Sequence, residues 1–171
     1  YNIFGCSGIL FNHESPLRGG EFVTKKIITD LARVKHNTLS NLSLGNIYSK
    51  RDWGYSEDYV EAMWLMLQQK KAEDYVISSG KTHTVKEFIN KAAKYYGFDL
   101  IWRGVGLDEK AIDKNTRKTV VRIDKKYFRP TEVNFLYGNS YKAKKILKWT
   151  PKTNINQLIK KMCDHEILKY K

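Results

Sequence analysis

Cysteine is scarce in this sequence of 171 residues: it occurs twice, as Cys6 and Cys163, far apart and without metal-ligand spacing. Two free thiols in apolar patterns are typical of a reducing compartment rather than of a disulfide framework. The four histidines show no metal-type spacing. No apolar run approaches the roughly 18 residues that a membrane helix needs, and no signal-peptide pattern opens the sequence. We therefore expect a cytoplasmic protein with no metal site and no membrane partner.

Acidic residues are also few, with 18 against 31 basic ones, which leaves a net charge of +13. An excess of this size favours anionic partners in general, and nucleic acid is the usual one. The lysines are nevertheless scattered over every segment, and no nucleic-acid motif of known spacing is present. We expect most of this charge to face solvent, a few cations to bind phosphate, and nucleic acid not to be the partner.

Signatures of catalysis are missing as well. The sequence has no glycine-rich dinucleotide loop, and no Tyr-x-x-x-Lys pair in a suitable context, although Tyr141 precedes Lys144 and Lys145. The chain opens at Tyr1 with an apolar pattern (Ile3, Phe4, Ile9 to Phe11) typical of a buried strand. Such a strand normally belongs to a sheet whose other strands are built earlier, so we expect a fragment whose own residues supply no catalytic group.

Strand and helix patterns alternate along the chain and predict an α/β protein with parallel strand pairing. The length by itself suits one ordinary core. Thr84 and Glu87 form a capping-box pattern, repeated by Asn154 and Gln157, and Gly97 suits a helix C-terminus. Strands are expected at 42–47, 74–79, 100–102 and 119–123, and helices at 21–35, 56–69, from 84 and from 154.

Two expectations concern packing. The apolar stripe on helix 56–69 is most simply explained as core; its members are Val60, Met63, Trp64 and Leu67. The stretch 104–118 is polar and charged between two strand patterns, which favours a mobile loop.

The turn after the first strand is the first candidate site, because ligands of open α/β sheets bind beyond the carboxyl ends of strands. Asn12 and His13 offer hydrogen bonds, Arg18 can hold a phosphate, and the glycines at 19 and 20 permit close backbone approach. A surface loop shaped by Ser-Pro and the glycine pair is an equally good explanation of the spacing.

Three further segments carry cations that suit phosphate. Lys25 and Lys26 lie where a helix N-terminus can dock an anion, although such lysines often face water. Arg51 is a candidate diphosphate ligand that Asp52 can orient, or half of a structural Arg-Asp pair. Arg129 can reach a phosphate and Glu132 can accept from sugar hydroxyls, unless the two belong to a loop ion pair.

Taken together, these segments resemble the GDP-mannose 4,6-dehydratase family of extended short-chain dehydrogenases/reductases. The resemblance covers nearly the whole chain, and Asn-His-Glu-Ser-Pro at 12–16 is its most specific part. The matching segments are 8–16, 22–24, 43–46, 51–54, 58–60, 127–133, 143–144 and 147–149.

The resemblance implies a Rossmann domain that binds NADP and a smaller C-terminal domain that binds GDP-mannose. The family oxidises C4 of the sugar, eliminates water across C5 and C6, returns the hydride to C6, and works as a dimer or tetramer. By position, His13 and Arg18 match its cofactor contacts. The positions that match its nucleotide-sugar contacts are Asn12, Val23, Lys26, Arg51, Arg129 and Glu132.

Two departures qualify the resemblance. Leu17 stands where the family often has a second arginine. The family's cofactor loop and its catalytic Thr, Glu, Tyr and Lys are expected upstream of Tyr1, so residues 1–171 would comprise the end of the Rossmann domain and the GDP-sugar-binding domain. Another NAD(P)-dependent nucleotide-sugar epimerase or dehydratase, and a non-catalytic basic binding module, are the alternatives.

Overall fold

The computed structural model describes residues 2–129 and 131–170; Tyr1, Lys171 and Pro130, the proline of the 129–132 segment, lie outside the described residues. The chain forms two compact units rather than the single core that its length suggests. The first unit comprises the described residues of 1–15, 50–83 and 135–158, and the second those of 16–49, 84–134 and 159–171. Both units combine α-helices with β-strands, which confirms the α/β class.

Short parallel strand pairs organise the first unit. β1 pairs with β5, so that Gly8, Ile9 and Leu10 lie opposite Tyr75, Val76 and Ile77. A second sheet has the order β2-β4-β6, and β2 runs parallel to β4. The elements are β1 (Gly8–Leu10), β2 (Asn12–Glu14), β4 (Lys50–Tyr55), α2 (Ser56–Leu67), β5 (Tyr75–Ile77), β6 (Thr82–Thr84) and a short π-helix (Ala143–Leu147).

The core of this unit lies on the face of α2 opposite to the expected one. The predicted stripe is exposed: Trp64 retains 61% of its surface and Val60 60%. Tyr59 and Met66 instead point inward, and the Trp149 indole donates to the Asp58 carbonyl at 2.9 Å. The buried cluster consists of Tyr59, Ala62, Met66, Tyr75, Ile77, Ala143, Leu147 and Trp149. The stripe prediction was therefore wrong, because both faces of α2 carry large apolar residues and periodicity alone does not choose between them.

The start of the chain also differs from the prediction. The first strand is only β1, and Ile3, Phe4 and Ile9 before and within it are exposed rather than buried. Leu10 is half-buried against the core of the first unit. Apolar residues in a strand pattern are buried only where another layer covers them.

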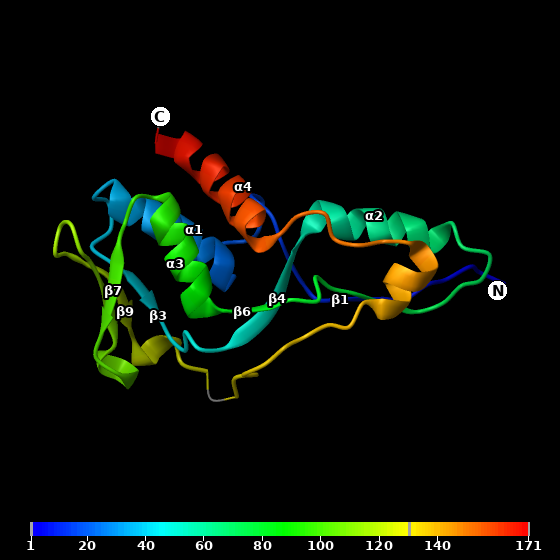
Figure 1. Cartoon of the computed structure of the whole chain (residues 1–171), viewed down its shortest axis with the longest axis horizontal. Coiled ribbons are helices and arrows are strands. Elements are labelled where there is room, and N and C mark those ends of the chain that lie inside the picture. Colours follow the sequence, from blue (N-terminus) through cyan, green and yellow to red (C-terminus); the bar gives the residue numbers. More distant parts are fainter. Residues whose placement is uncertain (1, 130, 171) are drawn as a thin grey trace. The chain divides into compact units, whose positions relative to one another are not determined.

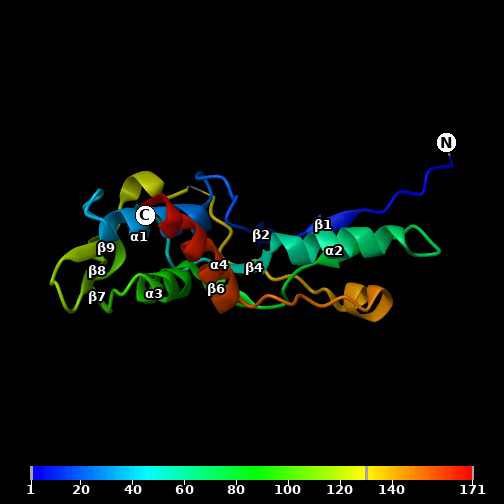
Figure 2. The same cartoon turned by 90° about the horizontal axis from the view of Figure 1, so that it is seen from above.

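The second unit is built on a four-stranded sheet of order β3-β9-β8-β7. β3 runs parallel to β9, whereas β8 is antiparallel to both of its neighbours. Helices α1 and α3 lie side by side and contact β3 and β7 respectively (Figures 1 and 2). The elements are α1 (Val23–Lys35), β3 (Leu42–Leu44), α3 (Val85–Tyr95), β7 (Leu100–Arg103), β8 (Lys110–Asp113) and β9 (Thr119–Ile123).

Local sequence signals set the ends of the helices. Thr84 and Glu87 exchange the two hydrogen bonds of a capping box at the start of α3, as predicted. Gly97 follows that helix with φ +85°, the left-handed conformation that glycine adopts most easily. Asn154 and Gln157 cap α4 (Ile155–Ile167) in the same way. These contacts lie within a few residues of sequence, which is why they were predictable.

The stretch 104–118 is ordered, so the expectation of a mobile loop was wrong. It contains the short 3₁₀ turn Gly106–Asp108 and then β8. The buried Asp113 side chain accepts hydrogen bonds from the amides of Asp99 and Thr116. Polar residues satisfy backbone groups here, and composition alone does not distinguish that role from solvation.

Both cysteine thiols are free, and they differ in how deeply they are buried. Cys163 is fully buried and Cys6 only half-buried. Burial raises the pKa of the Cys163 thiol to about 12, which keeps it protonated and unreactive. In the part of the chain that the structure describes, no helix is both long and apolar enough to cross a membrane.

Candidate functional site

Strands β2 and β4 place three of the candidate residues in the first unit. Asn12 lies opposite Trp53, and His13 opposite Gly54. Arg51 stands two positions before Trp53 on β4, so it shares the sheet face of Trp53. Because the register is set by backbone hydrogen bonds, the pairing brings Asn12 and the Arg51 strand next to each other.

The hydrogen bond of His13 defines its tautomer. Nδ1 lies 2.9 Å from the carbonyl oxygen of Phe11, and a carbonyl oxygen can only accept. Nδ1 therefore donates to this carbonyl, and in the neutral form of the ring Nε2 is an acceptor. The ring packs at 5.5 Å against Tyr59, which is fully buried. His13 is thus a half-buried ring held from one side, able to accept a hydrogen bond from a ligand.

Asp52 has a structural role at the turn that follows β5. Its buried carboxylate accepts from the amide and hydroxyl of Ser79, at 2.8 and 2.5 Å, and from the amide of Gly80 at 2.9 Å. Arg51 and Asp52 are successive residues of β4, and successive residues of a strand point to opposite faces of the sheet. Asp52 therefore organises the turn after β5.

The N-terminus of α1 gathers the candidate cations of the second unit. Its N-cap is Phe22, which makes no side-chain cap hydrogen bond, and the first turn holds no acidic residue. Arg18 lies over the Phe22 ring, with Cζ 3.4 Å from the ring centroid. Helix amides that no side chain caps carry a partial positive charge, and two kinds of cation lie beside them. This arrangement suits a phosphate.

The two neighbouring lysines of α1 have different roles. Lys25 is buried and donates to the Pro16 carbonyl and to Glu166, each at 2.9 Å, so it is structural and not the phosphate ligand that the sequence allowed. Lys26 is half-buried, with Nζ 3.6 Å from the centroid of the Tyr127 ring. One helical turn on, burial raises the pKa of Asp30 despite the nearby charge of Lys26.

Lys26 contacts the segment that carries Arg129, through the ring of Tyr127. Tyr127 ends the 3₁₀ turn Lys125–Tyr127, and Arg129, two residues later, is exposed. Val23 is half-buried at the first position of α1, and Glu132 is half-buried beyond Arg129. Sequence reasoning did not single out Tyr127 as a site residue; its place two residues before Arg129 was the available signal.

The candidates thus form two groups, one in each unit. Asn12, His13 and Arg51 belong to the first; Arg18, Val23, Lys26, Arg129 and Glu132 belong to the second. The first group offers an amide, an imidazole acceptor and a guanidinium. The second offers helix amides and cations, the chemistry of phosphate binding. Among the described residues, no cluster of three or more His, Cys, Asp or Glu side chains is suited to a metal ion.

Comparison with known sequences gives consistent matches. A family model described as GDP-mannose 4,6 dehydratase matches residues 1–162. Over 167 residues, 98% of its length, the chain is 51% identical to GDP-mannose 4,6 dehydratase of Dictyostelium discoideum. It is 48% identical to that of Drosophila melanogaster and 47% identical to that of Homo sapiens. The matches cover 47%, 42% and 45% of those proteins, so the chain spans about half of their length.

Solved structures agree on the fold. RMD from Pseudomonas aeruginosa complexed with NADPH superposes with a TM-score of 0.76 at 20% identity, over 95% of this chain and 48% of that one. A dTDP-glucose 4,6-dehydratase from Bacillus anthracis in complex with NAD gives 0.69 at 18% identity, over 95% of this chain and 44% of that one. At these identities the likeness concerns the fold, which is Rossmann-like.

Proposed function

The chain belongs to the GDP-mannose 4,6-dehydratase family, and on that premise we propose that it holds GDP-mannose and part of NADP in an enzyme that makes GDP-4-dehydro-6-deoxymannose. The observation that carries the proposal is the N-terminus of α1 with Arg18 and Lys26 beside it. A nucleoside diphosphate carries the charge that such a site complements. Arg51 and Arg129 serve the diphosphate and nucleotide end, with Asn12, Val23 and Glu132 as further substrate contacts.

NADP is the proposed cofactor, held in part by His13 and Arg18. The residues fit that role: the His13 ring is fixed by Phe11 with its other nitrogen left as an acceptor, and Arg18 is a guanidinium at a helix N-terminus. When bound, NADP accepts and returns a hydride. The sequence of this chain has no glycine-rich loop for the pyrophosphate, so these residues supply only one side of the cofactor site.

The chain by itself is proposed to bind and position, not to catalyse. Its sequence lacks the nucleotide loop and a Tyr-x-x-x-Lys pair in suitable context, and it spans about half of its relatives. We place the complete enzyme in the cytoplasm as a homodimer or homotetramer, in keeping with the two free thiols.

Calorimetric titration with GDP tests the binding role. The 171-residue chain should bind GDP more tightly than UDP, and Arg129→Ala or Arg51→Ala should weaken GDP binding at least tenfold. Lys114→Ala is the matched control, since Lys114 pairs only with exposed Asp99 among the described residues. Absence of GDP binding, or duplex DNA binding that falls steeply with salt, would reject the proposal in favour of a basic binding module.

A chimera tests the catalytic assignment. This chain replaces the corresponding part of the Dictyostelium relative, to which it is 51% identical. The chimera should convert GDP-mannose, whereas the purified 171-residue chain should not. Turnover by the isolated chain would contradict the assignment of catalytic groups to the rest of the enzyme.

A further inference from the structure

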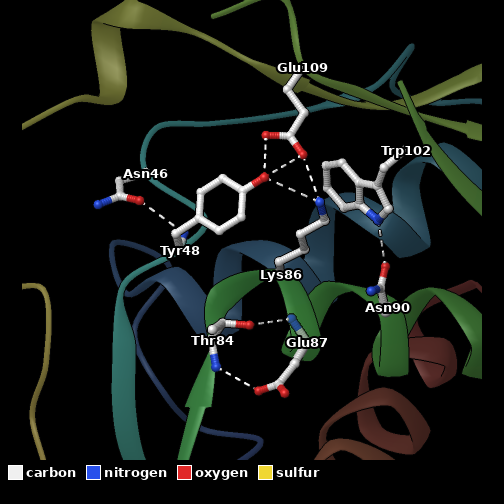
Figure 3. Close-up of polar contacts among 8 residues, drawn as sticks. All are labelled: Asn46, Tyr48, Thr84, Lys86, Glu87, Asn90, Trp102 and Glu109. Carbon is white, nitrogen blue, oxygen red and sulfur yellow. Dashed lines mark hydrogen bonds and ion pairs between the residues drawn. The ribbon is translucent and has the colours of Figure 1, made fainter. Parts of the chain in front are cut away.

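One buried carboxylate of the second unit is not among the residues assigned above. Glu109 is 4% exposed, and its oxygens accept from the hydroxyl of Tyr48 at 2.8 and 2.9 Å and from Nζ of Lys86 at 2.7 Å (Figure 3). Lys86 also lies over the Trp102 ring, 4.4 Å from its centroid. Burial opposes the charge of Lys86, but its hydrogen bonds to Glu109 and Tyr48 outweigh that penalty and raise its pKa. The three polar groups therefore form one hydrogen-bonded network.

This network joins three segments that are distant in sequence. Tyr48 lies in the loop 45–49 that follows β3, Lys86 in the first turn of α3, and Glu109 just before β8. Backbone bonds support the same junction, because the amide of Lys86 donates to the Ile47 carbonyl at 2.8 Å and the amide of Val85 to the Ser49 carbonyl at 3.1 Å. The loop 45–49 is therefore held against α3 by its backbone and against Glu109 by its one aromatic side chain.

The same loop supports the segment that carries Arg129. A Cβ on Gly45 would lie 2.3 Å from the Tyr127 carbonyl oxygen, so the two backbones are in direct contact. The amide of Asp124 donates to the Leu44 carbonyl at 2.8 Å. Whereas Gly45 contacts the backbone of Tyr127, Lys26 lies over its ring. The path of residues 124–129 is thus set by Leu44 and Gly45 on one side and by Lys26 of α1 on the other.

We propose that Glu109, together with Tyr48 and Lys86, is a positioning residue for the GDP-binding segment 127–129. The inference rests on the proposed function. Buried ion pairs add little net stability, because desolvation cancels much of their attraction. Their directional bonds do define geometry, since a buried carboxylate tolerates few arrangements of its donors. The expected signature of the network is therefore ligand affinity more than resistance to unfolding.

Two conservative variants test the network. Tyr48→Phe removes only the hydroxyl of a ring that is 58% exposed, and Glu109→Gln removes the charge at nearly the same volume. Each should weaken GDP binding by the 171-residue chain about fivefold to twentyfold. The double variant should be little worse than the more affected single variant, because both changes break one network. Lys114→Met, which removes an exposed ion pair with Asp99 in the same unit, is the matched control.

Hydrogen exchange gives a readout that does not depend on GDP. In Tyr48→Phe the amides of residues 124–129 should exchange faster than in the wild type, while those in the middle of α1 stay unchanged. In the chimera, the same variant should raise KM for GDP-mannose and leave kcat within about twofold, as expected when binding rather than chemistry is disturbed.

The outcomes separate this inference from the proposed function. If the wild-type chain does not bind GDP, the proposed function fails and the inference fails with it. If the wild type binds GDP and both variants bind it equally well with unchanged exchange at 124–129, the inference alone is overturned. If Glu109→Gln does not fold, Tyr48→Phe decides the question.

Discussion

Glu166 accepts a hydrogen bond from Nζ of Lys25 at 2.9 Å, and both side chains are buried. Lys169 donates to the same carboxylate at 2.9 and 3.0 Å. Lys25 also holds the Pro16 carbonyl, so one ammonium links the segment before α1 to the end of α4 within the second unit. This pair excludes Lys25 from ligand binding and leaves Lys26 as the lysine of the candidate site.

The pair makes stability depend on pH. Burial tends to raise the pKa of Glu166, but Lys25 and Lys169 outweigh it, so the folded-state pKa lies below the ordinary value. A lowered carboxyl pKa stabilises the fold above the unfolded pKa of about 4.3, and this contribution is lost as pH falls through the folded value. Urea unfolding followed from about pH 6 to pH 3 should show a shallower loss of stability in Glu166→Gln than in the wild type. An equally steep loss in both proteins would contradict this origin.

Lys25→Met should remove about 1.5–3 kcal/mol at neutral pH, the usual contribution of a hydrogen bond to a charged group. Lys160→Met is the control, because its pair with Asp164 is exposed on both sides. Exposed pairs contribute about 0–1 kcal/mol.

The two faces of α2 should respond differently to truncation. Met66 is 3% exposed in the core of the first unit, so Met66→Ala should cost about 2–5 kcal/mol. Trp64 on the apolar stripe is 61% exposed, so Trp64→Ala should change the unfolding free energy of the 171-residue chain by no more than about 0.5–1 kcal/mol. Denaturant unfolding of both variants measures the difference. A larger cost for Trp64→Ala than for Met66→Ala would show that the stripe is the core after all.

Asp52 and Arg51 are adjacent and should have separable effects. Asp52→Asn places an amide where the amides of Ser79 and Gly80 donate, which should cost about 1.5–3 kcal/mol of stability. Arg51→Ala should cost less stability than Asp52→Asn and should weaken GDP binding, because the carboxylate of Asp52 is buried whereas the hydrogen bond from Arg51 to the Lys50 carbonyl is exposed. Thermal unfolding and calorimetry on the same two variants check this division. Comparable loss of stability in Arg51→Ala would support the structural Arg-Asp pair instead.

Predictions from sequence succeeded where the deciding contacts are local. The capping box joins Thr84 to Glu87, three positions later, and Gly97 needs only its own φ to end α3. Helix α1 begins at Val23, two residues later than predicted, and ends at Lys35 as predicted. Parallel pairing followed from the alternation of strands and helices, whereas the antiparallel β8 was hidden in a stretch whose composition is that of a loop.

Predictions failed where a choice depended on distant partners. Lys25 and Lys26 are equivalent in sequence, and only Glu166, 141 residues away, makes one structural. The network of Tyr48, Lys86 and Glu109 has no sequence pattern, because its members come from three segments that the sheet brings together.

The sequence by itself determined the family, the α/β class, the helix ends and the residue types suited to phosphate, since these depend on motifs and short-range bonding. Tertiary structure alone decided which face of α2 is buried, which lysine of α1 is available to a ligand, and that Asp52 serves a turn. The physical reason is that burial and pairing of a side chain depend on residues far away in sequence, and periodicity or spacing does not encode their positions.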